Sequence, residues 1–209
     1  LSCAGYLNFN QTIKILRIRG NAMQNSVPEG EGGMLAVLGS SIEYIEKILR
    51  ENEKFFQADI ANDNSNGQIV ISGRTKDLKN LSEFLKTNRI KNIKLPVSAP
   101  FHCSLMKNAT EIMKSELQKI DFQKSNNILI SNVTANEILD EKELKELLIN
   151  QIEMRVRWRE SILNMINKGV DQFIEIGPGK VLSGLIKRIN KDIKITSINQ
   201  QSDIESLKI

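Results

Sequence analysis

Residues 33–73 read GMLAVLGSSIEYIEKILRENEKFFQADIANDNSNGQIVISG, and the spacing of their apolar residues changes between strand and helix periods. The changes predict, in chain order, a strand, an amphipathic helix and two further strands, at residues 33–39, 41–53, 55–62 and 69–73. Ser40 or Ser41 would cap the helix, because a side-chain oxygen there can accept from the first free N–H groups. The turn between the last two strands contains Asn66-Gly67, a pair typical of tight turns.

The pattern continues beyond this stretch with a second helix at 75–88 and a fourth strand at 90–98. The complete order is strand, helix, strand, strand, helix, strand, which is the order of a ferredoxin-like split βαβ subdomain. We therefore expect residues 31–97 to form a subdomain of this kind.

The segments on either side alternate helices with short apolar strands. Helices are expected at 9–25, 103–120, 141–152 and 158–169, strands at 126–133 and 192–199, and a strand, glycine turn and helix within 170–189. The apolar stripe of the first helix consists of Ile13, Leu16 and Met23, widened by Ile15 and Ile18. Such an alternation favours an α/β layer. We expect residues 1–30 and 98–209 to form a larger parallel-sheet domain into which the smaller one is inserted.

The composition argues against several classes of protein. Of the 209 residues 40% are hydrophobic and 26% charged, as in an ordinary globular chain. No uncharged apolar run approaches the ~18 residues of a membrane helix. The net charge of +4 is spread among glutamates with few aromatic residues, so a nucleic acid is a weak candidate partner. Cys3 and Cys103 have no metal-ligand spacing and form no disulfide framework.

The stretch GPGK at 177–180 follows an apolar strand, which raises the hypothesis of a phosphate loop, because N–H groups at a helix N-terminus bind anions. The spacing does not fit that motif. No glycine stands five positions before Gly179, and Lys180 is followed by Val181 rather than Ser or Thr. A tight strand-to-helix turn is the favoured interpretation. The sequence also lacks the G-x-S-x-G pentapeptide of a nucleophile elbow.

His102 is the single histidine of the sequence, and it lies between an extended segment ending at Pro100 and a possible helix cap at Ser104. Near a helix N-terminus the imidazole would stay neutral and could act as a general base toward a hydroxyl. It could equally be a hydrogen-bonded core residue or an exposed turn residue. Its neighbour Cys103 is expected to be a small buried residue rather than a nucleophile.

Arg19 lies late in the first predicted helix, after Arg17. One interpretation is a solvated cation that stabilises the helix C-terminus. The other is a bidentate clamp for a carboxylate, for which the guanidinium fork is suited. The sequence pattern does not choose between them.

Five blocks of the sequence are informative together. They are RIRGNAMQNSVPEGEGGMLAVLG (17–39), ANDNSNGQIVISG (61–73), LPVSAPFHCSLM (95–106), ISNVTA (130–135) and FIEIGPGKVLSGLIKR (173–188). In order and spacing they closely resemble the malonyl-CoA:acyl carrier protein transacylases of dissociated fatty-acid synthesis, over essentially the whole chain. The resemblance implies an α/β-hydrolase-like core with an inserted ferredoxin-like subdomain. It departs at Asn66, where the family usually has proline.

The resemblance also implies roles for individual residues. His102 would be the general base of a Ser-His dyad, and the backbone carbonyl of Gln151 would orient its ring. Arg19 would pair with the free carboxylate of the malonyl group. The resemblance further implies an acyl pocket lined by Met23 and Phe101 and a polar residue near it, Asn62. The ring of Phe101 would crowd the α-carbon and so favour malonyl over branched groups.

The family's nucleophile serine lies in a G-H-S-x-G block that would precede Leu1, and a G-Q-G-S-Q block lies further upstream. Neither block is in the sequence, so we expect a fragment or a remainder after cleavage, inactive alone. We also expect it to be poorly soluble or dependent on the missing part, because apolar faces of the sheet would be exposed.

Malonyl-CoA and acyl carrier protein are the implied partners, with ping-pong transfer between them and no metal or redox cofactor. Lys187 and Arg188 could help to dock an acidic carrier protein, or could be solvated surface charges. The full-length protein would be a monomer in the cytoplasm if bacterial, or in a plastid-type organelle if eukaryotic. The alternatives are an acyltransferase domain of a polyketide synthase and a noncatalytic remnant that binds carrier protein.

Overall fold

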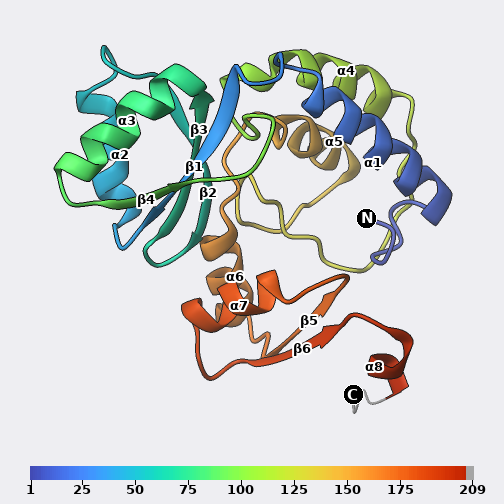
Figure 1. Ribbon diagram of the computed structural model, residues 1–209. Helices are drawn as coiled ribbons and strands as arrows, with labels where there is room; N and C mark the ends of the chain where they lie inside the picture. The colour runs from blue at the N-terminus through green and yellow to red at the C-terminus, as the bar shows by residue number, and fades with distance from the viewer. Residues whose placement is uncertain (206–209) are drawn as a thin grey trace.

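The structure of the protein is a computed structural model, and it describes residues 1–205 (Figure 1). The longer helices are α1 Phe9–Gln24, α2 Ile42–Glu51, α3 Thr75–Thr87, α4 Lys107–Gln118, α5 Glu141–Asn150, α6 Trp158–Asn167 and α7 Val181–Ile189. The short ones are the 3₁₀ turn η1 Ser104–Met106 and α8 Gln201–Glu205. The strands are β1 Gly32–Leu38, β2 Ala58–Ser65, β3 Gln68–Arg74, β4 Lys91–Lys94, β5 Gln172–Ile176 and β6 Lys194–Ile198.

The strands β1 to β4 form one antiparallel sheet in the order β2-β3-β1-β4. This order, with α2 and α3 as the two connections, is the split βαβ arrangement that the sequence predicts. All four strands lie inside the predicted 31–97 segment. The exact domain boundaries, including the large domain of 1–30 with 98–209, stay a prediction. We call β1–β4 with α2 and α3 the sheet lobe.

The two faces of the sheet lobe have different partners. On one face α2 and α3 cover the sheet (Figure 1), and the core there is made of Leu35, Val37, Ile45, Ile48, Phe56, Ile69, Ile71, Leu78, Leu81 and Leu85. On the other face Met34, Ala61 and Val70 form a small cluster. Phe101 packs against that cluster, so the second face of the sheet lies against the loop that carries the histidine.

The helices α1, α4 and α5 enclose a second core beside the sheet lobe (Figure 1). α1 begins with a capping box, in which Asn8 and Gln11 satisfy each other's backbone N–H groups. Its buried face consists of Ile15, Ala22 and Met23. The predicted stripe was therefore wrong in part, because Ile13 and Leu16 are exposed at 47% and 56%.

The chain ends in a smaller unit, in which β5 and β6 pair in parallel and α6 and α7 pack beside them. Within residues 1–205 parallel strand pairing in a sheet is confined to this pair. The face formed by β5 and the start of α7 leaves apolar side chains exposed, namely Ile174, Ile176, Val181 and Leu182. None of the helices in the described part of the chain is long and apolar enough to cross a membrane.

The strand predicted at 126–133 is wrong, because the segment forms only an isolated bridge between Ile130 and Glu137. Side-chain oxygens take two of its backbone donors instead: Ser125 Oγ accepts from Asn127 N, and Ser131 Oγ accepts from Val133 N. Such local bonds compete with strand ladders. Three smaller differences are that β2 begins three residues later than expected, at Ala58, that β4 ends before Pro96, and that α8 was not predicted.

Candidate active site

His102 lies in the loop between β4 and η1, and its backbone is in the left-handed region with φ 57°. The residues on either side are fixed by packing. Pro100 and Cys103 are both buried. A Cβ added to Gly32 would lie 2.4 Å from Cγ of Pro100, so only glycine lets β1 approach the loop this closely.

The imidazole has a defined hydrogen-bond partner. Nδ1 of His102 lies 2.9 Å from the carbonyl oxygen of Gln151, the residue that follows α5 as its C-cap. A carbonyl oxygen can only accept, so Nδ1 carries the proton and donates to it. The other ring nitrogen, Nε2, is then the basic atom of the neutral ring.

The surroundings favour that neutral form. Burial lowers the pKa of His102 below its ordinary value, and the charge of Arg19 lowers it further. The hydrogen bonds with the backbone of Gln151 and Met154 raise the pKa, but by less than the other effects lower it. The imidazole is therefore neutral at pH 7 and able to accept a proton at Nε2.

Arg19 lies on α1, half-buried, and burial lowers its pKa. It takes part in none of the ion pairs found within residues 1–205. A half-buried guanidinium without a carboxylate favours an anionic partner, because the paired charge offsets its lost solvation. Met23, one helical turn further on, is buried in the core beneath.

The remaining predicted residues lie on the sheet side of the loop. Phe101 is half-buried and packs against both neighbouring cores. Asn62 lies in β2 at an irregularity of the ladder and forms a parallel bridge with Val156. Asn62 therefore lies beside Val156, and Phe101 lies in the histidine loop itself, directly before His102.

Residues 151–157 connect these parts. Gln151 holds the imidazole, and five positions later Val156 N donates to Ala61 O at 2.8 Å while its carbonyl accepts from Asp63 N at 3.0 Å. The same short segment therefore orients the histidine and extends the edge of the sheet lobe.

An ion pair that the sequence did not predict joins β2 to α6 beside this segment. Asp63 is 1% exposed, and both of its carboxylate oxygens accept from Nε of Arg159, at 3.1 and 3.0 Å. Nη2 of Arg159 adds a contact of 2.8 Å. The two residues are far apart in sequence, and neither belongs to a recognisable motif.

Other nucleophiles near His102 are engaged elsewhere. Burial raises the pKa of the Cys103 thiol to about 12, and Sγ donates to Pro100 O at 2.9 Å. The hydroxyl of Ser104 donates to Asp59, and that of Ser72 donates to Phe101 O. No serine oxygen within residues 1–205 is hydrogen-bonded to the imidazole. The same residues contain no group of three potential metal ligands.

The glycine stretch at 177–180 is a strand-to-helix turn, as predicted, and its anion site is already occupied by the protein itself. The carboxylate of Glu175 accepts from Leu182 N at 3.0 Å, and from Ser183 N and Oγ at 2.7 and 2.5 Å. These are the donors that a bound phosphate would need. A phosphate loop is therefore excluded by structure as well as by spacing.

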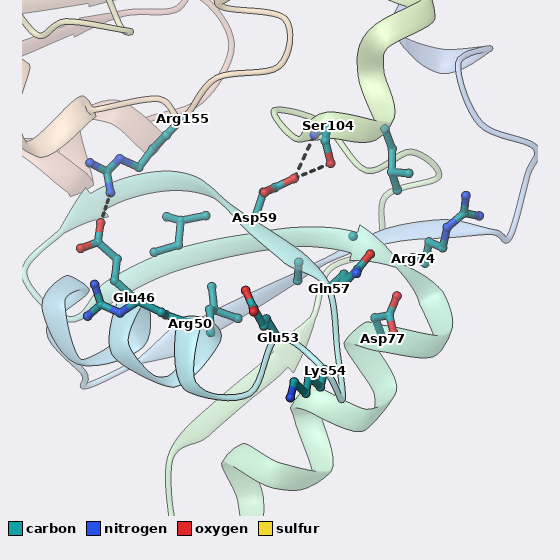
Figure 2. Close-up of a pocket in the computed structure, with 15 residues that line it drawn as sticks. Glu46, Arg50, Glu53, Lys54, Gln57, Asp59, Arg74, Asp77, Ser104 and Arg155 are labelled. Atoms are coloured by element: carbon teal, nitrogen blue, oxygen red, sulfur yellow. Dashed lines mark hydrogen bonds and ion pairs between the residues drawn. The ribbon is translucent and has the colours of Figure 1, made fainter.

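A cleft of about 920 Å³ opens along the outer edge of the sheet lobe, between α2, the start of β2 and η1 (Figure 2). Figure 2 shows Asp59 directed toward Ser104 across it, and Glu46 toward Arg155. His102 is not among its lining residues. The imidazole therefore does not line this cleft, although Ser104 and Leu105 of the following turn do.

Lys187 and Arg188, at the end of α7, both have internal partners. Lys187 Nζ donates to the carbonyls of Lys191 and Ile193, and Arg188 donates to the side chain of Gln68. Their participation in docking stays a prediction.

The comparison with protein families decides the classification. The model of the acyl transferase domain family matches residues 1–206. The chain belongs to this family. This acyl transferase domain is 42% identical over 207 residues to malonyl CoA-acyl carrier protein transacylase of Bacillus subtilis (strain 168). The match covers 98% of this chain and 65% of that protein.

Solved structures of acyl transferases give the same picture. Malonyl CoA-acyl carrier protein transacylase from Clostridium perfringens matches with a TM-score of 0.94 at 42% identity, over 99% of this chain and 65% of that one. A malonyl-transacylase in complex with a type II polyketide synthase acyl-carrier protein matches with a TM-score of 0.93 at 33% identity, over 99% and 67%. The expected mixed α/β fold is confirmed, and this acyl transferase domain spans about two thirds of the length of these relatives.

Proposed function

We propose that the protein transfers malonyl groups from malonyl-CoA to the phosphopantetheine thiol of acyl carrier protein in fatty-acid biosynthesis, by a ping-pong mechanism. The observation that carries the proposal is the neutral His102 with its proton fixed on Nδ1, beside the half-buried and unpaired Arg19. A proton acceptor next to a site for a carboxylate is the arrangement that this reaction requires.

In the first half-reaction His102 Nε2 would take the proton of a serine hydroxyl, which the resemblance places upstream of Leu1. The serine oxygen forms a bond to the thioester carbonyl carbon, and the carbon–sulfur bond breaks. CoA leaves with the proton that the imidazolium returns. Throughout, the Gln151 carbonyl would stabilise the imidazolium by accepting from Nδ1.

In the second half-reaction the phosphopantetheine thiol takes the place of CoA. His102 accepts the thiol proton, the sulfur attacks the O-malonyl ester, and the serine is released with the proton. Each step is proton and acyl transfer alone, so the proposed reaction needs no metal or redox cofactor. For a bacterial source the cytoplasm is the proposed compartment.

Arg19 would select the acyl group by pairing with the malonyl carboxylate. A substrate that lacks the carboxylate would leave the guanidinium buried without a partner, which penalises its binding. Met23, Phe101 and Asn62 would shape the pocket around the acyl chain. The relatives' names support this substrate class, because those proteins are malonyl transacylases.

The test measures malonyl transfer from malonyl-CoA to acyl carrier protein, for this chain and for a form extended upstream through its own gene. We expect transfer by the extended form only, and a loss of about 10²–10⁴-fold in His102→Ala, the range of general base catalysis. Arg19→Ala should lose the preference for malonyl over acetyl. Arg17→Ala, an exposed arginine of the same helix, is the matched control and should keep it.

Two results would contradict the proposal. If the extended form transfers nothing but binds carrier protein, the noncatalytic remnant is the better description. If His102→Ala transfers at the wild-type rate, the imidazole is not the base.

A further inference from the structure

His102 is one of the few non-glycine residues with a left-handed backbone within residues 1–205, the others being Arg89 and Ala135. This backbone conformation is strained for a residue with a Cβ. It persists only where several contacts with the surrounding structure hold it in place. The hydrogen bond of the ring to Gln151 fixes the side chain but not the backbone. The loop must therefore be held by bonds to the residues on either side of His102.

Both neighbouring positions are held by the sheet lobe. Before the histidine, Oγ of Ser72 donates to Phe101 O at 2.6 Å, and Ser72 is fully buried in β3. After it, Oδ2 of Asp59 accepts from both N and Oγ of Ser104, each at 2.9 Å (Figure 2). The bonds therefore reach the chain one residue before and two residues after His102.

The two anchors form one unit of the sheet. Asp59 and Ser72 are directly opposite each other in the ladder between β2 and β3. Paired residues project from the same face of a sheet. That face is the one that carries Val70 and packs against Phe101, since Ile71 and Ile60 belong to the core on the opposite face.

We propose that the cross-strand pair of Asp59 and Ser72 are positioning residues, which hold the strained loop so that His102 keeps Nδ1 on Gln151 and Nε2 free. Neither residue contacts the imidazole through a hydrogen bond. They act through the backbone of the loop. The inference rests on the proposed function only for the chemical role of His102, because the position of the ring can be measured without any transfer reaction.

The single histidine makes the measurement direct, since one imidazole gives one set of signals. We would label histidine with ¹⁵N in the 209-residue chain and follow both ring nitrogens by NMR across pH. The native ring should show the Nδ1–H tautomer and a pKa below the ordinary value of about 6.5. Asp59→Ala should mix the two tautomers and raise the pKa toward that value, as the released ring becomes solvated.

Two controls separate the hydrogen bond from charge and from fold. Asp59→Asn removes the charge but keeps an oxygen that can accept from Ser104, so it should restore the native tautomer. Glu53→Ala removes another carboxylate of the same cleft, one without a hydrogen-bond or ion-pair partner within residues 1–205, and should change nothing. Thermal unfolding of each variant verifies that the fold is intact.

Ser72→Ala removes the hydrogen bond on the other side of the loop and should likewise mix the two tautomers and raise the pKa of His102. If one of the two alanine variants fails to fold, the other still tests the proposal. The inference is overturned if either folded alanine variant keeps the native tautomer and pKa, or if Asp59→Asn behaves as Asp59→Ala. A native protein with the Nε2–H tautomer would overturn both the positioning and the base assigned under the proposed function, whereas a native Nδ1–H tautomer without malonyl transfer by the extended form would contradict the proposed function alone. Positioning and proposed function can therefore fail separately.

Discussion

The sheet lobe and the C-terminal unit of β5, β6, α6 and α7 are built from similar apolar residues but bury them to different extents. In the sheet lobe α2 and α3 close one face, and Leu81 and Ile71 are fully buried. In the C-terminal unit the buried core is small, and Ile176 is 72% exposed. The contrast teaches that strand and helix patterns alone do not reveal whether a sheet face has a partner.

The junction between the two regions should have the largest effect on stability. Arg159→Ala would leave the carboxylate of Asp63 buried without its cation, which costs about 3–5 kcal/mol in buried pairs. We expect the free energy of unfolding in urea to fall by this order. Lys47→Ala, which breaks an ion pair with both side chains more than half exposed, is the control and should change it by less than about 1 kcal/mol. Equal losses in the two variants would contradict a buried junction.

The next largest effect on stability separates the closed core of the sheet lobe from the exposed face of β5. Leu81→Ala should lower the free energy of unfolding by about 2–5 kcal/mol, because it opens a cavity in a closed core. Ile176→Ala should change it by no more than about 0.5 kcal/mol, since that side chain is already in water. Urea denaturation of both variants measures the difference. Similar losses would mean that the exposed face of β5 is covered in solution.

The smallest expected change in the free energy of unfolding is that of Glu175→Gln. Desolvation raises the pKa of Glu175, but the hydrogen bonds from Ser183 and Leu182 together lower it below the ordinary value. A lowered pKa stabilises the fold at pH values above the carboxyl's unfolded pKa, and the contribution is lost as pH falls through the folded one. Because solvent screens this carboxylate, Glu175→Gln should cost less than about 1 kcal/mol at pH 7, and nothing once the native carboxyl is protonated.

Thermal unfolding of Glu175→Gln across pH measures that difference. Asp171→Asn, an exposed carboxylate just before β5, provides the control. If the Gln variant loses the same stability at every pH, the contribution comes from packing and not from the charge.

Local patterns predict the sheet lobe well for physical reasons. Its strands and helices follow the apolar period, and Ser41 caps α2 as expected. The segment 126–133 has the same apolar period, but its side-chain oxygens divert the backbone, and period alone does not reveal this. The exposure of Leu16 likewise depends on which elements are near, which spacing along α1 does not contain.

The candidate site could be predicted only where a motif or resemblance marks it. The resemblance singles out His102, Arg19 and Gln151, and the structure brings His102 and Gln151 into contact, while the roles of the three residues stay predictions. Asp59 and Ser72 were not found, because their bonds to the loop span 45 and 29 positions and involve ordinary surface and strand residues. The left-handed backbone of His102 has no sequence signal either, since glycine or asparagine is the usual marker.

The segment between Gln151 and Val156 has a consequence for evolution. Loops between elements usually accept insertions and deletions with little cost. Here one end supplies the carbonyl for the imidazole and the other pairs with β2, and only four residues lie between them. Inserting or deleting one residue would move either the Gln151 carbonyl away from the imidazole or Val156 out of register with β2. The length of this segment is therefore under stronger constraint than the identity of the exposed residues within it.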